Sequence, residues 1–332
     1  GQAPARQAAI EAGIPPESGA TTINKMCGSG MKAIMFGHDS IIAGHNNIVI
    51  AGGIENMSNT PYVLPKVRNG LRMGHHQIKD HMFLDGLEDA YDEGKLMGSF
   101  AEDTAEHYQF TREQQDNFSI SSLERAKKAN ENGTFNDEIV PVKVINRKSE
   151  IIINKDEQPF KANIAKIPTL KAAFRKNGTV TAANSSSISD GASSVVLMKE
   201  SEANRRGLQP LARIVTHSTN SQEPKWFTTA PIGAIEKVLN KAGWNKNEVD
   251  LFEVNEAFAV VPMAVMKDLG IPHDIINIFG GACALGHPVG ASGSRIVTTL
   301  INALHKKGLK KGVASLCIGG GEATALALEI VK

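Results

Sequence analysis

Cysteine is scarce in this sequence, which has three of them, at positions 27, 283 and 317. An odd number of widely spaced cysteines argues against a disulfide framework and against a zinc ribbon. We therefore expect a reducing compartment, the cytoplasm. Long apolar runs are lacking as well, because none reaches the roughly 20 residues that a membrane span requires. The sequence therefore predicts no membrane partner.

A large net charge is also lacking, since 36 basic residues face 35 acidic ones and the net charge is +1. This balance gives no electrostatic footprint for nucleic acid, and any anionic ligand must be held by local groups. Aromatic residues make up 5% of the chain, whereas there are 31 glycines. The composition suits a soluble α/β protein with many tight turns, and 332 residues predict two or three domains.

Helical and strand patterns alternate in both end portions of the chain. Near the start we expect helices over 4–12 and 31–43, a short strand over 20–24, and a central parallel strand at the apolar run 47–51. The last portion predicts a further series, with strands at 211–218, 249–254, 275–278, 312–318 and 323–331 and helices at 231–242, 257–269 and 290–307. Such alternation is typical of a doubly wound α/β fold.

The middle portion interrupts this alternation. From about Asn59 the chain is irregular and polar, and it then predicts helices over 100–109 and 112–131 and a strand or hairpin over 138–153. We interpret 58–187 as an inserted loop subdomain.

The two end portions contain similar short motifs. Residues 27–30 (CGSG) align with 290–293 (GASG), and 50–53 (IAGG) align with 317–320 (CIGG). An internal duplication explains both matches. The first copy then lacks counterparts of several elements of the second, so we expect an incomplete first half and a chain that is a fragment of a longer protein. The predicted domains are 1–57 together with 188–208, then 58–187, and then 209–332.

The turn at Cys27 has the features of a reactive-cysteine site. It lies between the expected strand and helix, where unpaired backbone N–H groups and the positive end of the helix dipole point at the side chain. Such surroundings favour thiolate over thiol, and Gly28 and Gly30 leave the sulfur uncrowded. A small buried cysteine that packs the start of a helix explains the local sequence equally well.

Three further clusters carry polar or reactive groups. Asn255 directly follows an apolar strand, where capping the next helix is its more common role. His287 lies in a loop of small residues, 280–293, which leaves its imidazole accessible. Cys317 ends a strand and precedes three glycines, of which Gly319 and Gly320 are candidates for an oxyanion hole.

The motifs CGSGMKA, NEAFA, GHPVGASGSR and CIGGG, in this order, resemble the signature set of the thiolase family, in its acetyl-CoA acetyltransferase branch. The resemblance covers essentially the whole chain. It implies an α/β fold of duplicated doubly wound layers (α-β-α-β-α) with an inserted loop subdomain that binds CoA. It also implies a reversible Claisen condensation of two acetyl-CoA molecules to acetoacetyl-CoA and CoA, with CoA thioesters as substrates and no metal or other cofactor.

The resemblance assigns a role to each reactive residue. Cys27 is the nucleophile that takes the acyl group, and His287 is the base that activates it. A cysteine suits thioester exchange because the attacking and leaving thiols have similar basicity. Cys317 is the base that deprotonates the second acetyl-CoA. One oxyanion faces His287 and a water held by Asn255, and the other faces the N–H groups of Cys27 and Gly319.

For CoA itself, the resemblance indicates the segment 179–186, with Ala182 and Ser186 at the contacting positions. Further residues fall where apolar groups pack on the adenine or the pantetheine or beside them: Met97, Phe174, Ala257 and Phe258. A turn for Ser186 and core packing for Phe174 explain these two residues as well.

The chain departs from many short-chain members at two places. Leu96-Met97 stands where they have a His-Met pair, and Phe227 lies where they have a Met. A bulky Phe227 predicts short acyl groups and leaves the acceptance of branched chains open.

Three alternatives remain open. A degradative 3-ketoacyl-CoA thiolase of broader chain length would differ in chain-length kinetics. A ketoacyl-carrier-protein synthase would pair its cysteine with two histidines, where this chain has Asn255 and Cys317. A non-catalytic CoA-binding relative would be expected to have lost a catalytic group. Because family members usually form dimers or tetramers, the resemblance also implies a homodimer or a homotetramer.

Overall fold

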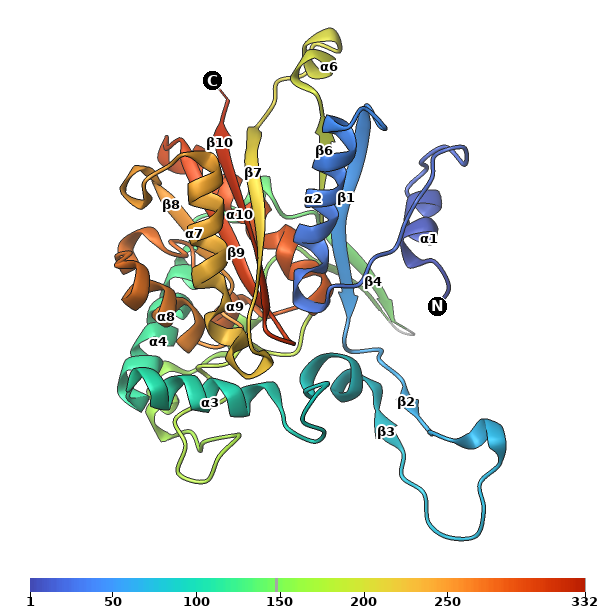
Figure 1. The fold of residues 1–332 in the computed structure, drawn as a ribbon, viewed down its shortest axis with the longest axis vertical. Coiled ribbons are helices and arrows are strands. Elements are labelled where there is room, and N and C mark those ends of the chain that lie inside the picture. Colours follow the sequence, from blue (N-terminus) through green and yellow to red (C-terminus); the bar gives the residue numbers. More distant parts are fainter. Residues whose placement is uncertain (147–148, 332) are drawn as a thin grey trace.

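The larger sheet of the protein has four strands. The computed structural model describes residues 1–146 and 149–331, and in it this sheet has the order β7-β10-β9-β8 (Figure 1). Its strands are β7 (Ala212–Ser221), β8 (Leu251–Val254), β9 (Lys311–Ile318) and β10 (Glu322–Ile330). β8 and β9 are parallel, whereas β10 is antiparallel to both of its neighbours. Four of the five strands predicted for the last portion are thus confirmed.

The prediction of a fifth strand at 275–278 is wrong. A short 3-10 helix, η8 (His273–Ile275), occupies its start, and Ile276 makes only an isolated bridge to Phe252. Asn277 then turns the chain with a φ of 47°, a left-handed conformation that no regular strand contains.

A second sheet consists of β1 (Ile48–Asn56) and β6 (Asp190–Met198), which are antiparallel. The prediction of a central parallel strand at 47–51 is therefore wrong, because β1 is antiparallel and pairs with β6 alone among the described residues. Ile50 and Ile54 are 55% and 53% exposed, so the apolar run did not indicate burial on both faces. The strand expected at 20–24 is also wrong, since this segment has no partner strand and runs as irregular chain.

Two helices, α2 (Ser29–Ile42) and α10 (Val289–Lys307), lie between the two sheets. Each of them contacts the other, the smaller sheet and the larger sheet. Glycines allow the close approach, because a Cβ on Gly30 would collide with the backbone of Ser294, and one on Gly293 with the backbone of Met31. Gly30 and Gly293 hold equivalent positions in the two matched motifs. The duplication read from the sequence therefore reappears as a symmetric helix crossing.

The outer face of the larger sheet is covered by α7 (Ala230–Ala242), against which α8 (Val260–Leu269) packs (Figure 1). Alternating helical and sheet layers follow, and the predicted α/β class is confirmed. The expected helix at 4–12 is α1 (Pro4–Glu11). No helix among the described residues combines the length and the apolar character that crossing a membrane requires.

The middle portion contains the predicted helices as α3 (Met97–Tyr108) and α4 (Arg112–Glu131). A hairpin of β4 (Val142–Asn146) and β5 (Ser149–Ile153) confirms the strand pattern at 138–153, of which residues 147 and 148 lie outside the described part. The irregular polar stretch is an arm that leaves the body at β2 (Tyr62–Val63) and returns at β3 (Lys79–Asp80), as Figure 1 shows. Two short 3-10 helices carry residues of the predicted site: η1 (Met26–Gly28) contains Cys27, and η6 (Pro224–Thr229) contains Phe227.

Candidate active site

Cys27 lies in η1, immediately before α2, where the chain is held in a constrained turn. Met26 has a φ of 47°, a conformation uncommon for residues other than glycine. Its N–H donates to Asn24 Oδ1 at 2.8 Å, and its carbonyl accepts from Ser29 Oγ at 2.8 Å. A Cβ on Gly28 would collide with the side chain of Ile318. The turn therefore rests against the end of β9, where Cys317 is located.

The structure brings the two sulfurs together. The N–H of Gly319 hydrogen-bonds to the Cys27 thiol and lowers its pKa. Cys317 is fully buried, and its pKa is raised well above the ordinary value, first by burial and then by the negative charge that a Cys27 thiolate would carry. Like-charge repulsion of this kind acts only between near neighbours. Cys27, Cys317 and Gly319 therefore belong to one site.

The expectation that the turn favours thiolate at Cys27 is wrong. Burial of the thiol raises the pKa of Cys27 to about 11, although the N–H groups of Gly319 and of Cys27 itself oppose this change. The charge of Glu55 adds a smaller rise. Desolvation thus outweighs the backbone donors, and at neutral pH Cys27 is a thiol that needs a base.

His287 has the properties of such a base. Its Nδ1 lies 2.5 Å from Ser292 Oγ, and that hydroxyl donates its one proton to the carbonyl of Pro288 at 3.0 Å. Because Ser292 then has no proton left for the imidazole, we assign the ring proton to Nδ1. Nε2 is left with a free lone pair, and it is buried without a hydrogen-bond partner. Burial, and then the charge of Arg295, lower the pKa of His287 to about 4, so the ring is neutral at pH 7.

Asn255 is placed beside this histidine rather than at the start of a helix. Helix α8 begins five residues later, at Val260, so the expected cap is wrong. Asn255 Nδ2 lies 3.4 Å from His287 Nδ1, and Asn255 Oδ1 accepts from Arg295 at 3.4 Å. The backbone N–H of Asn255 donates to Ser315 O at 3.0 Å, two residues before Cys317. With the ring proton on Nδ1, both facing nitrogens are donors, so the amide lies beside the imidazole without a hydrogen bond between them. The backbone of Asn255 joins this region to the end of β9.

A buried group of charges lies behind Asn255. Glu253 is 2% exposed, and burial raises its pKa to about 8, although Arg295 opposes the rise. The same guanidinium lowers the pKa values of Glu138 and Asp156, which burial raises. Arg295 Nη1 lies 3.9 Å from Glu253 and has no hydrogen-bond partner. One arginine thus balances several buried carboxyl groups while it holds the amide of Asn255.

The residues expected to contact CoA lie close to one another. The N–H of Ser186 donates to Ala257 O at 3.0 Å. The rings of Phe174 and Phe258 pack edge to face with centroids 6.1 Å apart. The segment 179–186 is thereby joined to the loop that follows Asn255, and Ala182 is exposed on this segment.

Met97 connects this region to the sulfurs. A Cβ on Gly98, its neighbour, would collide with the ring of Phe174. A Cβ on Gly319 would meet the Met97 sulfur at 3.4 Å. Met97 therefore contacts the glycine turn that follows Cys317. In that turn Gly320 has a φ of 89°, which favours glycine.

The structure also identifies residues that the motifs contained but to which we assigned no role. Ser292 sets the tautomer of His287, and Arg295 holds Asn255, and both lie within GHPVGASGSR. Their positions, five and eight residues after His287 on the same helix start, were the available signal. Glu55 accepts from the N–H of Gly290 at 2.8 Å. No feature of the sequence pointed to this contact.

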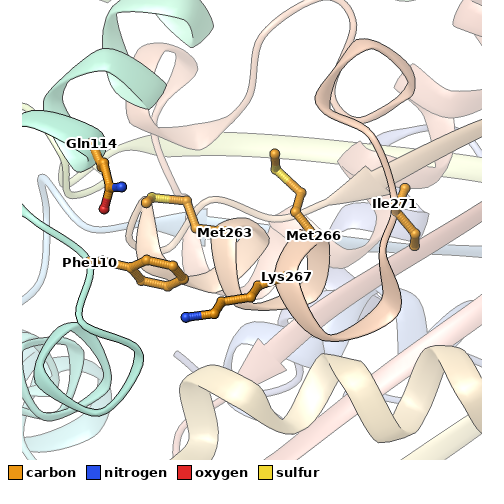
Figure 2. A pocket seen from close by; sticks show the side chains of 6 residues that line it. All are labelled: Phe110, Gln114, Met263, Met266, Lys267 and Ile271. Atoms are coloured by element: carbon orange, nitrogen blue, oxygen red, sulfur yellow. The ribbon is translucent and has the colours of Figure 1, made fainter.

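A surface hollow lies elsewhere. It has a volume of about 370 Å³ and is lined by Phe110, Gln114, Met263, Met266, Lys267 and Ile271 (Figure 2). None of the predicted site residues lines it, and none of its side chains carries a thiol or a hydroxyl. Among the described residues, one group of side chains is suited to a metal ion, namely His38, Asp39 and His217. These three are not among the residues predicted for the catalytic site.

Comparisons with known proteins match the whole chain. The family model described as the thiolase N-terminal domain matches residues 1–201, and that of the thiolase C-terminal domain matches residues 208–330. A probable acetyl-CoA acetyltransferase of Dictyostelium discoideum is 53% identical over 99% of this chain and 80% of its own length.

Two solved structures have the same fold. The acetyl-CoA acetyltransferase of Bacillus anthracis superposes with a TM-score of 0.95 at 43% identity, over 98% of this chain and 82% of its own. A thiolase of Ascaris suum, solved in complex with coenzyme A, superposes with a TM-score of 0.94 at 41% identity, over 100% of this chain and 84% of its own.

Proposed function

The chain belongs to the thiolase family, and from this membership we propose that it is an acetyl-CoA C-acetyltransferase. It catalyses the reversible condensation of two acetyl-CoA molecules to acetoacetyl-CoA and CoA. Two observations support the proposal: two thiols lie close together at a strand end, and a neutral histidine has a buried Nε2 without a hydrogen-bond partner.

The first half-reaction forms an acyl-cysteine. His287 Nε2 takes the thiol proton of Cys27 as the sulfur attacks the thioester carbonyl of acetyl-CoA. Because the pKa of Cys27 is about 11 and that of His287 about 4, the proton moves together with the attack rather than before it. The carbonyl–sulfur bond of the thioester then breaks, and the leaving CoA thiolate takes a proton from Cys317.

The second half-reaction forms the carbon–carbon bond. The Cys317 thiolate removes a proton from the methyl carbon of the second acetyl-CoA, and the resulting enolate attacks the acetyl group on Cys27. The Cys27 sulfur leaves and recovers its proton from His287. Both cysteines and the histidine end as they began, and acetoacetyl-CoA is the product.

Two oxyanions develop along this path, and backbone and side-chain donors serve each. The N–H groups of Cys27 and Gly319, which both act on the Cys27 sulfur, serve the acyl-enzyme. Asn255, through a water, and His287 serve the enolate of the second substrate. Each well-placed donor is worth about 3 to 4 kcal/mol in comparable acyl transfers.

CoA lies along the segment that carries Ala182 and Ser186, with apolar contacts to Met97, Phe174, Ala257 and Phe258. Phe227 in η6 supports a short acyl group, because it is 3% exposed and packs edge to face on Phe100 at 6.1 Å. It belongs to the same buried cluster as Cys317.

The proposal includes further points for which the family supplies the expectation. The reaction needs no metal or redox cofactor, because both half-reactions consist of proton and acyl transfers between groups already named. We place the protein in the lipid metabolism of the cytoplasm, as a homodimer or homotetramer. Light scattering of the purified protein would determine the number of subunits.

The thiolysis of acetoacetyl-CoA by CoA tests the proposal. Cys27→Ala and Cys317→Ala should each lower kcat by about 10³-fold or more. Cys283→Ala is the matched control, because this third cysteine contacts Glu256 and has no place in the mechanism. Full activity of Cys27→Ala, or a higher rate with 3-ketohexadecanoyl-CoA than with acetoacetyl-CoA, would contradict the assignment.

A labelling experiment separates an enzyme from a non-catalytic CoA-binding relative. Iodoacetamide should alkylate Cys27 at a rate that still rises above neutral pH, since its pKa is raised to about 11. Acetyl-CoA should block the reaction, because the acyl group occupies the sulfur. Labelling that acetyl-CoA leaves unchanged would favour the non-catalytic alternative.

A further inference from the structure

Two histidines and one aspartate from different parts of the chain meet away from the thiols. His38 and Asp39 belong to the C-terminal end of α2, and His217 belongs to β7. One ligand atom from each of them lies within 4.8 Å of the others. The mechanism proposed above uses none of these residues.

The distances suit a metal with short bonds. Asp39 Oδ1 lies 2.9 Å from His217 Nε2 and 3.7 Å from His38 Nδ1. In a tetrahedral zinc site with bonds of about 2.0 to 2.1 Å, neighbouring ligand atoms lie roughly 3.3 Å apart. The two observed distances lie on either side of this value, so small side-chain rotations would complete three of the four ligand positions.

An unpartnered nitrogen of His38 is the second observation that points to a metal ion. Its Nδ1 is buried and has no hydrogen-bond partner, although Asp39 and His217 lie beside it. A buried polar atom without a partner is costly. A cation between the three side chains would remove that cost, because it would bind the lone pair of Nδ1 directly.

The donor set selects the kind of cation. The site offers one carboxylate, so hard cations such as Mg²⁺ and Ca²⁺, which need several oxygen ligands, are disfavoured. Imidazole nitrogen suits transition metals, and the negative end of the α2 dipole adds a small attraction.

We propose that His38, Asp39 and His217 form a binding site for a divalent transition metal of the zinc type. Water completes the fourth position, since Asp39 is half exposed to solvent and three protein ligands leave one position open. The metal would clamp the end of α2 onto β7. Because α2 begins at the Cys27 turn and β7 belongs to the sheet that carries Cys317, a bound metal would stabilise the join between the two halves of the protein.

The test uses the whole purified protein, freed of metal with a chelator and titrated with Co²⁺ or Zn²⁺. We expect one Co²⁺ per chain, with visible bands of a tetrahedral nitrogen and oxygen site and without a sulfur-to-cobalt charge-transfer band. Zn²⁺ should raise the melting temperature, whereas Mg²⁺ should not. Alkylation of Cys27 beforehand should change neither result, which separates this site from metal bound by the thiols.

Variants of the three ligands decide the assignment. His38→Gln, His217→Gln and Asp39→Asn should each weaken Co²⁺ binding by more than the roughly 10- to 100-fold that loss of a second-shell partner costs. His45→Gln is the matched control, an exposed histidine just beyond the same helix. A triple variant, with His75→Gln, His76→Gln and His81→Gln, controls for the histidines of the protruding arm. Each variant is checked for its metal-free melting temperature.

Several results would overturn the proposal. One is the absence of binding at a metal concentration of about ten times that of the protein, when any Zn²⁺-induced stabilisation is also missing. Another is binding that His38→Gln and His217→Gln leave intact, or that the arm variant abolishes. If one glutamine variant fails to fold, Asp39→Asn still decides, because it keeps the size of the side chain and removes only the charge.

Discussion

At the scale of single residues, the site depends on a hydroxyl with one proton. Ser292 gives that proton to Pro288 O and therefore receives one from His287 Nδ1. The free Nε2 of the base is thus determined by a serine five positions further along the chain. In the proposed mechanism His287 is the base for Cys27, which is a thiol at neutral pH, so the tautomer of His287 should affect the rate.

Ser292→Ala tests this dependence. Without the hydroxyl, Nδ1 loses its 2.5 Å partner, and both tautomers of His287 become accessible. We expect kcat for thiolysis to fall by about 10- to 100-fold, which corresponds to the roughly 1 to 3 kcal/mol of an unmet buried hydrogen bond. The KM for CoA should change little, since the Ser292 hydroxyl contacts His287 and Pro288 and is not hydrogen-bonded to the segment 179–186.

Ser294→Ala is the control for this variant, because its buried hydroxyl has the carbonyls of Ala291 and Ser193 as acceptors, at 2.9 and 3.1 Å, and does not contact the histidine. Ser292→Thr should recover part of the rate, since it restores a hydroxyl. A Ser292→Ala enzyme with the kcat of the parent would show that another group determines the tautomer.

At the scale of elements, the helices were more predictable than the strands. α2, α4 and α10 could be read from local patterns, and the capping box at Thr111 and Gln114 is present in the structure. A helix satisfies its backbone within itself, so local sequence decides it. A strand needs a partner strand. The segment 20–24 has a strand-like sequence, but the structure gives it no partner strand.

The same distinction holds for the site. The motifs identified Cys27, His287 and Cys317 because their neighbours are small or glycine, which is a local property. The family resemblance implied a place for Asn255 near His287. The pKa of Cys27 and the contact of Asn255 with Arg295 could not be predicted, because burial and the position of Arg295 are set by packing between distant elements. Asn255 was expected to cap a helix, and instead its amide is held by Arg295 from α10.

The crossing of α2 and α10 supports a prediction for Gly293→Ala. In an exposed helix this exchange stabilises by about 1 kcal/mol. Here the added Cβ would collide with the backbone of Met31, which cannot move without shifting α2 and with it the Cys27 turn. We therefore expect a loss of about 1 to 3 kcal/mol in the free energy of unfolding, as for other overpacked sites, measured by urea denaturation.

Gly86→Ala is the comparison, because a Cβ there meets nothing within 4 Å. It should leave stability unchanged or slightly higher. If Gly293→Ala stabilised the protein to the same extent, the close approach of the two helices would not be the reason for glycine at this position.

At the scale of the whole molecule, one buried charge group spans several parts of the chain. Arg295 comes from α10 and Glu253 from β8, and Glu138 and Asp156 belong to the middle portion. With Glu256, four carboxyl groups interact with one guanidinium, so they cannot all be balanced when ionised. The free energy of unfolding should therefore depend on pH through this group.

Glu253 contributes a part whose sign can be worked out. Its pKa is about 8 in the folded protein, against 4.5 for the unperturbed group. A folded pKa above the unfolded one gives a contribution that is complete below pH 4.5 and is lost as the pH rises through about 8. Glu138, with a pKa raised to about 7, changes stability in the same direction.

Glu253→Gln should therefore flatten the fall in stability between about pH 5 and about pH 8, by on the order of 2 kcal/mol. The glutamine keeps the size of the side chain and has no charge to bury, so the loss that accompanies ionisation disappears. Urea denaturation at several pH values measures the slope. Glu202→Gln is the control, because the arginines beside that exposed carboxyl lower its pKa to about 2, outside this range. A slope that Glu253→Gln leaves unchanged or makes steeper would mean that Arg295 keeps Glu253 ionised throughout, so that the variant would leave the guanidinium without its partner.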